Sequence, residues 1–267
     1  LHYVGPYIVE KRNTPMQNPW KHAFHSGMSS ASDLRAAIQA GVPVGVVANL
    51  LTNAQVFLAL PKYLDRGGKV FVDSGAFTAF QKRESMQWDR VFFTYDALIN
   101  QTDFPSNLSI VAPDVVGDQA ATLGLWHEHA MQITGWIARG VRVIVPLQKG
   151  VLSAGRMLEK ATEIFASSKF AAGIPSNLEA MTAADCSTLW HHDFHILGRV
   201  KLTPDLSLKL EALGKNNPGA QFTSDANWLR SRLKKISAIQ TSRPDMRYQL
   251  ETRRTQAVRA VLDFDSY

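Results

Sequence analysis

Eight short apolar runs, rich in Val, Ile and Phe, recur at a steady spacing along the chain and constrain its fold most. They cover residues 22–26, 44–50, 69–73, 108–112, 141–147, 170–174, 194–198 and 220–224. Helical spacing follows several of them, at 30–40, 118–139, 153–167, 177–190 and 204–213. Near-continuous apolar strands that alternate with helices are typical of a parallel sheet covered on both faces. Eight such units predict an α/β fold, a (β/α)8 TIM-type barrel.

The chain shows no linker that would divide it, so we expect one domain. The barrel core is expected over about residues 20–235, with a basic C-terminal extension over about 236–267. Of 267 residues, 45% are hydrophobic and 19% are charged, which is typical of a folded protein and excludes a disordered or collagen-like chain. The net charge is +6, and residues 230–267 hold nine cations against four acids, a surplus of 9 − 4 = +5.

Several classes of protein are disfavoured by what the sequence lacks. No G-x-G-x-x-G follows a predicted strand and no G-x-x-x-x-G-K-[ST] occurs, so dinucleotide-binding and P-loop chemistry are not expected. The single cysteine, Cys186, can form neither an internal disulfide nor a cysteine-based zinc cluster, which indicates a reducing cytoplasm. No stretch approaches the roughly 20 apolar residues that cross a bilayer, so no membrane association is expected.

Carboxylates follow three of the predicted strands. Asp73 ends the third strand, Asp114 follows the fourth and Asp225 follows the eighth. Because a barrel gathers its reactive groups at the carboxyl ends of its strands, the three should face one mouth. An Asp after a strand is often only the N-cap of the next helix, which is the interpretation we favour for Asp118. Three carboxylates beside Gln148 favour a binding site instead.

The order of these motifs resembles a known family. The run F-V-D-S-G-A-F at 71–77 resembles the D-S-G-G-F segment of tRNA-guanine transglycosylases. Later landmarks match in the same order: P-D at 113–114, L-Q-K-G at 147–150, A-G-I at 172–174, I-L-G at 196–198 and S-D at 224–225. The resemblance covers about residues 70–230. The chain departs from the family where Ala76 replaces a glycine and where G-G-L has become G-I-P at 173–175.

The zinc site of the tRNA enzymes, three cysteines and a histidine, cannot be built with Cys186 alone. The sequence is therefore most similar to the zinc-free DNA-guanine transglycosylase (DpdA) family, and we expect neither metal nor cofactor. His191, His192 and His195 cluster around the seventh strand, where packing is a better interpretation than a metal site.

The resemblance implies exchange of guanine in DNA for a 7-deazaguanine such as preQ0, through a covalent aspartyl-sugar intermediate. In this pentosyltransferase Asp225 would be the nucleophile and Asp73 the acid/base group. The base would be bound by Asp114, Ser74, Gln148 and Gly173. The cations Arg230, Arg232, Lys234, Lys235, Arg253 and Arg254 would contact DNA phosphates, unless they only form a solvated helix face.

Alternative functions stay open at this stage. The chain could act on RNA as a tRNA-guanine transglycosylase-like enzyme, or bind nucleic acid without catalysis. It could also be a barrel hydrolase or isomerase that acts on a small metabolite. That class predicts a phosphate-binding glycine loop after the seventh or eighth strand, where the chain offers Arg199 and Lys201 but little glycine. DNA is the expected partner, and a homodimer or a partner protein is left open. The source is open between a bacterium and a phage in its host cell.

Overall fold

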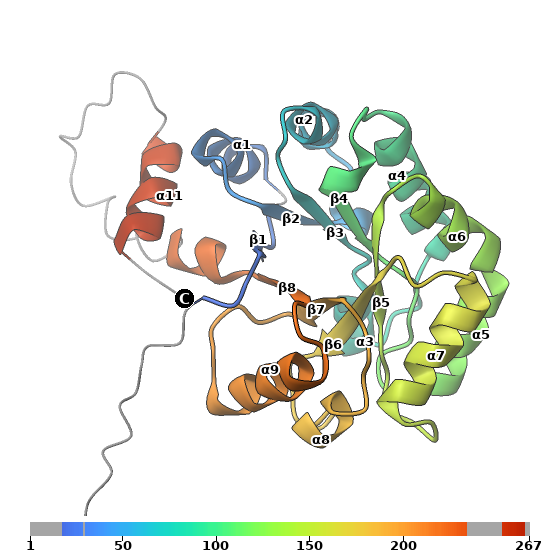
Figure 1. Ribbon diagram of the computed structural model, residues 1–267. Helices are drawn as coiled ribbons and strands as arrows, with labels where there is room; N and C mark the ends of the chain where they lie inside the picture. The colour runs from blue at the N-terminus through green and yellow to red at the C-terminus, as the bar shows by residue number, and fades with distance from the viewer. Residues whose placement is uncertain (1–17, 29, 234–252, 265–267) are drawn as a thin grey trace, which may run out of the picture.

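The computed structural model describes residues 18–28, 30–233 and 253–264, and these form a closed parallel barrel with strand order β1 to β8 (Figure 1). The strands are β1 (His22–His25), β2 (Val44–Val47), β3 (Val70–Asp73), β4 (Leu108–Val111), β5 (Arg142–Pro146), β6 (Ala171–Pro175), β7 (Asp193–Leu197) and β8 (Gln221–Ala226). The (β/α)8 prediction is confirmed, and each predicted strand lies within a few residues of an observed one.

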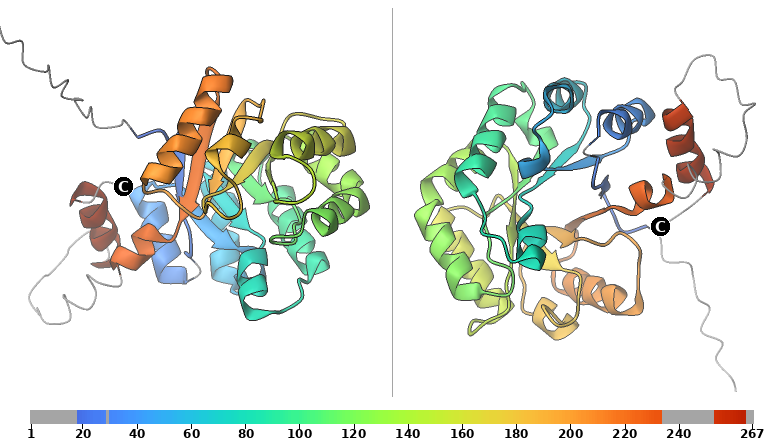
Figure 2. Two further views of the ribbon diagram at one scale, coloured as in Figure 1. Left: turned by 90° about the horizontal axis from the view of Figure 1, so that it is seen from below. Right: turned by 180° about the vertical axis from the view of Figure 1, so that it is seen from behind.

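Helices surround the barrel in all three views (Figures 1 and 2). They are α1 (Ala31–Ala40), α2 (Ala54–Asp65), α3 (Ala76–Lys82), α4 (Trp88–Asn100), α5 (Gln119–Glu128), α6 (Ala130–Ala138), α7 (Ala154–Phe165), α8 (Ala183–Cys186), α9 (Pro204–Asn216) and α11 (Arg253–Phe264), with short 3-10 turns at Ala48–Leu50 and Pro105–Asn107. The helix predicted over 118–139 is two helices that meet at His129, and only α8 occupies the helix predicted over 177–190. No helix among the described residues is long and apolar enough to cross a membrane.

Polar side chains fix the starts of several helices. Asp118 accepts a hydrogen bond from the Ala121 amide at 2.9 Å, so its predicted role as an N-cap is confirmed. The same capping role falls to Ser30, Asn53, Ser153, Thr182 and Thr203 in α1, α2, α7, α8 and α9. These caps satisfy amide groups that a helix cannot pair internally, so each helix begins at a defined residue.

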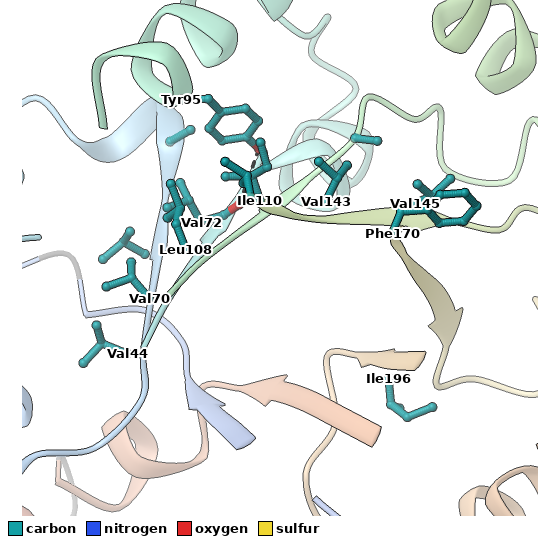
Figure 3. Packing of buried hydrophobic residues seen from close by; sticks show 14 of the residues in the cluster. Val44, Val70, Val72, Tyr95, Leu108, Ile110, Val143, Val145, Phe170 and Ile196 are labelled. Carbon is teal, nitrogen blue, oxygen red and sulfur yellow. Dashed lines mark hydrogen bonds between the residues drawn. The ribbon is translucent and has the colours of Figure 1, made fainter. Parts of the chain in front are cut away.

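The two-residue period of the strands produces two apolar layers. Val70, Val72 and Ile110 belong to the outer layer between the strands and the helices, where Figure 3 shows them with the Tyr95 ring of α4. The Tyr95 hydroxyl lies 3.2 Å from the Val111 carbonyl oxygen. The opposite side chains form a second cluster from five strands, Phe24, Phe71, Val111, Ile144 and Ala171, which fills the barrel interior.

An ion pair lies at the amino ends of β5 and β7. Arg142 donates two hydrogen bonds to Asp193, at 2.6 and 2.7 Å, and a third to the Thr223 hydroxyl at 2.8 Å. Both ionic side chains are largely buried. Removal of one partner would leave a buried charge unpaired, which is far more costly than the loss of an exposed pair.

The last described helix, α11, packs against α1 on the outside of the barrel (Figures 1 and 2). Its Val258 and Val261 are buried, and Arg254 lies 2.6 Å from the Asp33 carboxylate of α1. The part of the basic extension that the structure describes is thus packed on the barrel. Residues 236–252 and 265–267 of the predicted extension lie outside the described residues.

We expect Phe71→Ala to lower the free energy of unfolding by about 3–5 kcal/mol, because Phe71 is 1% exposed in the interior cluster and truncation leaves a cavity. Phe93→Ala is the matched control, since Phe93 is 75% exposed and its loss should change stability by no more than about 0.5 kcal/mol. Urea unfolding of both variants measures the difference. Equal effects at the two positions would contradict the assignment of Phe71 to the barrel interior.

Candidate active site

Three carboxylates meet at the mouth formed by the carboxyl ends of the strands. Asp73 is the last residue of β3, Asp225 is the penultimate residue of β8, and Asp114 lies three residues beyond the end of β4. Asp114 and Asp225 are buried, at 7% and 8% exposed. The structure therefore gathers the three acidic residues that the sequence predicts to share one site.

Asp225 is held by three hydrogen-bond donors, one in β7 and two in the loops that follow β1 and β7. Its Oδ2 accepts from the Ser26 hydroxyl at 2.8 Å. Its Oδ1 accepts from the Gly198 backbone N–H at 2.8 Å and lies 3.3 Å from His195 Nε2. Hydrogen bonds to a buried carboxylate favour its ionised form, and all three of these contacts converge on Asp225.

The tautomer of His195 follows from its partners. A carboxylate only accepts, so His195 Nε2 carries the hydrogen toward Asp225, and Nδ1 accepts from the Thr223 hydroxyl at 2.8 Å. Burial lowers the pKa of His195, which is 0% exposed, so its ring is neutral and this tautomer persists at neutral pH. Since Thr223 also accepts from Arg142, a polar chain runs through the barrel interior from that residue to Asp225.

Asp73 differs from Asp225 in its ionisation. Burial and the nearby charge of Asp225 raise the pKa of Asp73 to about 6, against the opposing effect of the backbone N–H groups of Ser74 and Gly75. Gly75 has φ +89°, a conformation that suits glycine, and its N–H lies 3.2 Å from Asp73 Oδ1. Asp73 can therefore gain and lose a proton near neutral pH, beside a carboxylate that stays charged.

Asp114 is a second carboxyl that holds a proton near neutrality. Burial and the charge of Asp73 raise its pKa to about 7. Gln148 Nε2 donates to Asp114 Oδ2 at 2.8 Å, and Gln148 Oε1 accepts from the Gly117 N–H at 2.9 Å. Both ends of the Gln148 amide are thus bound within the protein, and Gln148 orients Asp114.

Two of the predicted base-binding residues, Ser74 and Gly173, make structural contacts, and their role in base binding stays a prediction. Ser74 is 1% exposed, and its hydroxyl accepts from the Ala76 N–H at 3.2 Å, so it holds the turn into α3. The Gly173 carbonyl accepts from the Leu147 N–H at 2.9 Å within the barrel ladder. A Cβ at Gly173 would lie 3.0 Å from the Pro146 Cα, so glycine is needed there for packing.

Four site residues were not among the sequence predictions as partners of the carboxylates: Ser26, Asn49, His195 and Gly198. Three of them surround Asp225. Asn49 follows β2, and its buried Oδ1 makes no hydrogen bond among the described residues. A Cβ at Gly75 would lie 3.0 Å from Asn49 Nδ2, so this amide borders the Asp73 turn. Ser26, Asn49 and Gly198 follow the ends of β1, β2 and β7, and His195 points inward from β7. In the sequence, this placement relative to the strands is the only signal that could have predicted these four residues.

The predicted DNA-contacting cations are scattered. Arg230 lies 3.8 Å from Asp33, and Arg254 pairs with the same carboxylate, on the outside of the barrel. Arg232 borders the mouth, where its guanidinium carbon lies 5.9 Å from the centroid of the Trp228 ring. Lys234 and Lys235 lie outside the described residues, and Arg253 begins α11. A DNA contact by these residues stays a prediction.

The part of the chain that the structure describes contains no group of three or more His, Cys, Asp or Glu side chains placed to hold a metal ion. His191 Nε2 lies 2.7 Å from the Phe170 carbonyl oxygen, and His195 faces the barrel interior. The rings of His191 and His192 lie against each other, with centroids 4.7 Å apart, whereas His195 is bonded to Thr223 and Asp225.

No family model and no curated protein matches the chain. Solved structures do. A proposed fructose-1,6-biphosphate aldolase from Coccidioides immitis superposes with a TM-score of 0.55 at 12% identity, over 92% of this chain and 88% of that one. N-acetylneuraminate lyase from Mycoplasma synoviae gives 0.48 at 10% identity, over 92% and 98%. At these identities the likeness establishes the barrel fold.

The prediction of a DNA-guanine transglycosylase is wrong. The superposed structure with a TM-score above 0.5 is named as an aldolase and not as a transglycosylase. Within the site, Ser74, Gln148 and Gly173 each make hydrogen bonds inside the protein. The predictions of DNA modification and base exchange fall with this correction. The family resemblance itself is not tested by these matches.

We expect Asp114→Asn to stabilise the protein at pH 8 and to have little effect at pH 5. An Asp114 pKa raised to about 7 means that the folded protein binds this proton between about pH 4 and 7, where the unfolded chain has lost it. The free energy of unfolding therefore falls as pH rises through that window, by about 1.4 kcal/mol for each pH unit. Asn cannot ionise and avoids this loss.

Urea unfolding at the two pH values measures the effect, and Asp103→Asn, at an exposed carboxylate, is the matched control with no expected pH-dependent difference. The raised pKa would be contradicted if Asp114→Asn lowered the free energy of unfolding, relative to the parent, by the same amount at pH 8 and at pH 5.

Proposed function

We propose that the chain is an acid–base hydrolase of a small polar metabolite, with Asp73 as the proton donor and Asp225 as the fixed anion. The observation that carries the proposal is the difference between these neighbouring carboxyls. Asp73 has a pKa of about 6, whereas Asp225 accepts three hydrogen bonds that favour its charge. Two carboxyls with divergent ionisation are the arrangement used to break bonds whose cleavage builds positive charge on carbon.

The roles of the two groups follow from their protonation. Asp73 gives its proton to the leaving atom as the bond to carbon breaks, and Asp225 stabilises the positive charge that develops there. Water then adds to the carbon and returns a proton to Asp73. One bond of the substrate and one O–H bond of water are broken, and each product gains one part of the water molecule.

Lysine-based aldolase chemistry has less support. No described strand contains a lysine, so no amine projects from the barrel wall to form a Schiff base. Lys209 is 0% exposed and donates to the carbonyls of Pro175 and Asn177 at 2.8 Å, which gives it a structural role.

An isomerase is the second candidate, and Asp114 is the observation that favours it. With pKa values of about 7 and about 6, Asp114 and Asp73 form a pair that could remove a proton at one carbon and supply one at the next. The Asp73 charge raises the pKa of Asp114, so the two groups lie close enough to share one substrate.

Pools of small polar metabolites incubated with the protein in D2O and followed by 1H NMR distinguish the two reactions. A hydrolase converts one compound into two and leaves its C–H signals in place. An isomerase converts one compound into one other and exchanges a C–H proton for deuterium. Turnover of no compound in any pool, or turnover that both Asp73→Asn and Asp225→Asn retain, would overturn the proposal.

With the compound that is turned over, Asp73→Asn should lower kcat by roughly 10²–10⁴-fold, because the proton donor is lost. Asp225→Asn should lower it by roughly 10²–10³-fold, because the fixed anion is lost. Asp103→Asn removes an exposed carboxylate of the same type and should leave kcat unchanged.

The pH dependence of kcat should follow the proton on Asp73. The pKa of about 6 keeps the donor loaded below pH 6, so kcat should fall as pH rises through that value. In Asp73→Asn this limb should disappear from the profile of the residual activity. A rate that rises through pH 6 in the parent protein would assign Asp73 as a base and favour the isomerase.

A further inference from the structure

A cavity of about 370 Å³ opens at the barrel mouth between the segments that follow β7 and β8. It begins at the candidate active site, because Gly198 both lines the cavity and donates its N–H to Asp225, and Ala226 lines the cavity one residue after Asp225. Small-molecule sites occupy roughly 300–1,000 Å³, so this volume suits part of a compact metabolite.

The cavity is cationic. Its ten described lining residues include three positive side chains, Arg199, Lys201 and Arg232, and none of the ten is acidic. Asn227 and Ser231 add neutral polar groups. Three cations around one concavity favour an anion with several acceptor oxygens.

The loop that carries two of these cations is fixed by buried contacts. Ser224 of β8 donates its hydroxyl to the Arg199 carbonyl, and the Trp20 indole N–H donates to the Val200 carbonyl at 2.8 Å. Val200 is 2% exposed, while Arg199 and Lys201 on either side of it are exposed. Since the backbone is anchored at two successive residues, both cations are presented from a rigid framework.

The third cation comes from the opposite wall. The Arg232 guanidinium lies over the Trp228 ring, and both residues line the cavity. This contact with an aromatic ring holds the positive charge of Arg232 at the cavity wall. The β7 and β8 segments are also where barrel enzymes commonly place a phosphate site.

We propose that this cavity binds the phosphoryl group of a phosphate monoester, so that the substrate of the proposed hydrolase is a small phosphorylated metabolite. The identification of this phosphate monoester as the substrate rests on the proposed function. The cavity and its positive charges do not depend on that function. The phosphoryl group would lie beside Gly198 and place the reacting bond against Asp225 and Asp73. A nucleic-acid phosphate is the competing occupant, and the three cations around one concavity are fewer than the extended row of phosphate contacts that a nucleic-acid strand offers.

Binding of inorganic phosphate to the full chain, measured by calorimetry at pH 7.5 and constant ionic strength, tests the cavity without a substrate. The parent protein should bind phosphate, and Arg199→Ala/Lys201→Ala should raise the Kd at least tenfold. Arg35→Ala/Lys62→Ala is the matched control, because it removes the same two kinds of charge from a second cavity, between α1 and α2, and should leave the Kd unchanged. The urea midpoints of both double variants should match that of the parent.

Three results would overturn the proposal: no phosphate binding by the parent, an unchanged Kd in Arg199→Ala/Lys201→Ala, or loss of binding in the control pair instead. A competition experiment gives a fourth such result. If a 20-nucleotide DNA or RNA strand binds through Arg199 and Lys201, and a tenfold excess of phosphate over its nucleotides does not displace it, the cavity would be assigned to a polymer.

Asp73→Asn separates this proposal from the proposed function. It should bind phosphate at least as tightly as the parent while it loses turnover, because Asp73 does not line the cavity and loss of its negative charge cannot weaken the binding of an anion. Phosphate binding without turnover of any pool would leave the cavity assignment standing and reject the hydrolase. Turnover confined to compounds without phosphate, with a KM that Arg199→Ala/Lys201→Ala leaves unchanged, would reject the cavity assignment and keep the hydrolase.

Discussion

The pairing of β8 with β1 is the constraint on which the candidate site depends. These strands are about 200 residues apart in the chain, and the parallel register that joins them places Phe24 beside Asp225 and His25 beside Ala226. Ser26 then follows β1 at the level where its hydroxyl reaches Asp225. Closure also sets the charge of Asp225 within reach of Asp73, which raises the pKa of the latter. A sheet that stayed open at this seam would have neither the three-donor anion nor its proton-holding neighbour.

The closed barrel has an interior that must be filled with side chains. Apolar side chains alone could not support an anion at the mouth, because they offer it no hydrogen bonds. Phe24 and Phe71 fill one part of it, and the Phe71 ring stacks on His195 with centroids 5.1 Å apart. The polar part is a chain of hydrogen bonds from Arg142 through Thr223 and His195 to Asp225, in which Arg142 Nη1 alone has no partner among the described residues. Hydrogen bonds between buried polar groups offset the cost of removing those groups from water.

The sequence predicts the strands well and the partners of the carboxylates poorly, for a physical reason. The runs of Val, Ile and Phe report burial on both faces of each strand, and residue order alone places Asp73, Asp114 and Asp225 at strand ends. Helix limits depend on finer balances: His129 divides one predicted helix, and α2, α3 and α4 have no named counterpart among the predictions. The roles of Ser26 and His195 depend on which strands become neighbours in space, and no local pattern encodes that. The ordered motifs that resemble a transglycosylase lie at the strand ends, where any barrel enzyme keeps its polar residues, and so the activity drawn from them was wrong while the fold was right.

The mouth of the barrel has an acidic side, with three carboxyl groups, and a basic side, with the three cations of the cavity. Asp73, Asp114 and Asp225 are buried or half-buried on one side, and the raised pKa values of Asp73 and Asp114 lower the joint negative charge of the group as the pH falls below 7. Arg199, Lys201 and Arg232 line the neighbouring cavity. A dianion in that cavity would bring negative charge next to the carboxyls and raise the pKa of Asp73 further, because like charges disfavour ionisation. Binding of the anionic end of a substrate would then help to keep the proton on the donor at the reacting end. The protein environment and an anion bound in the cavity thus both raise the pKa of Asp73. This shared effect is a physical reason for placing the carboxyls and the cavity close together around Gly198.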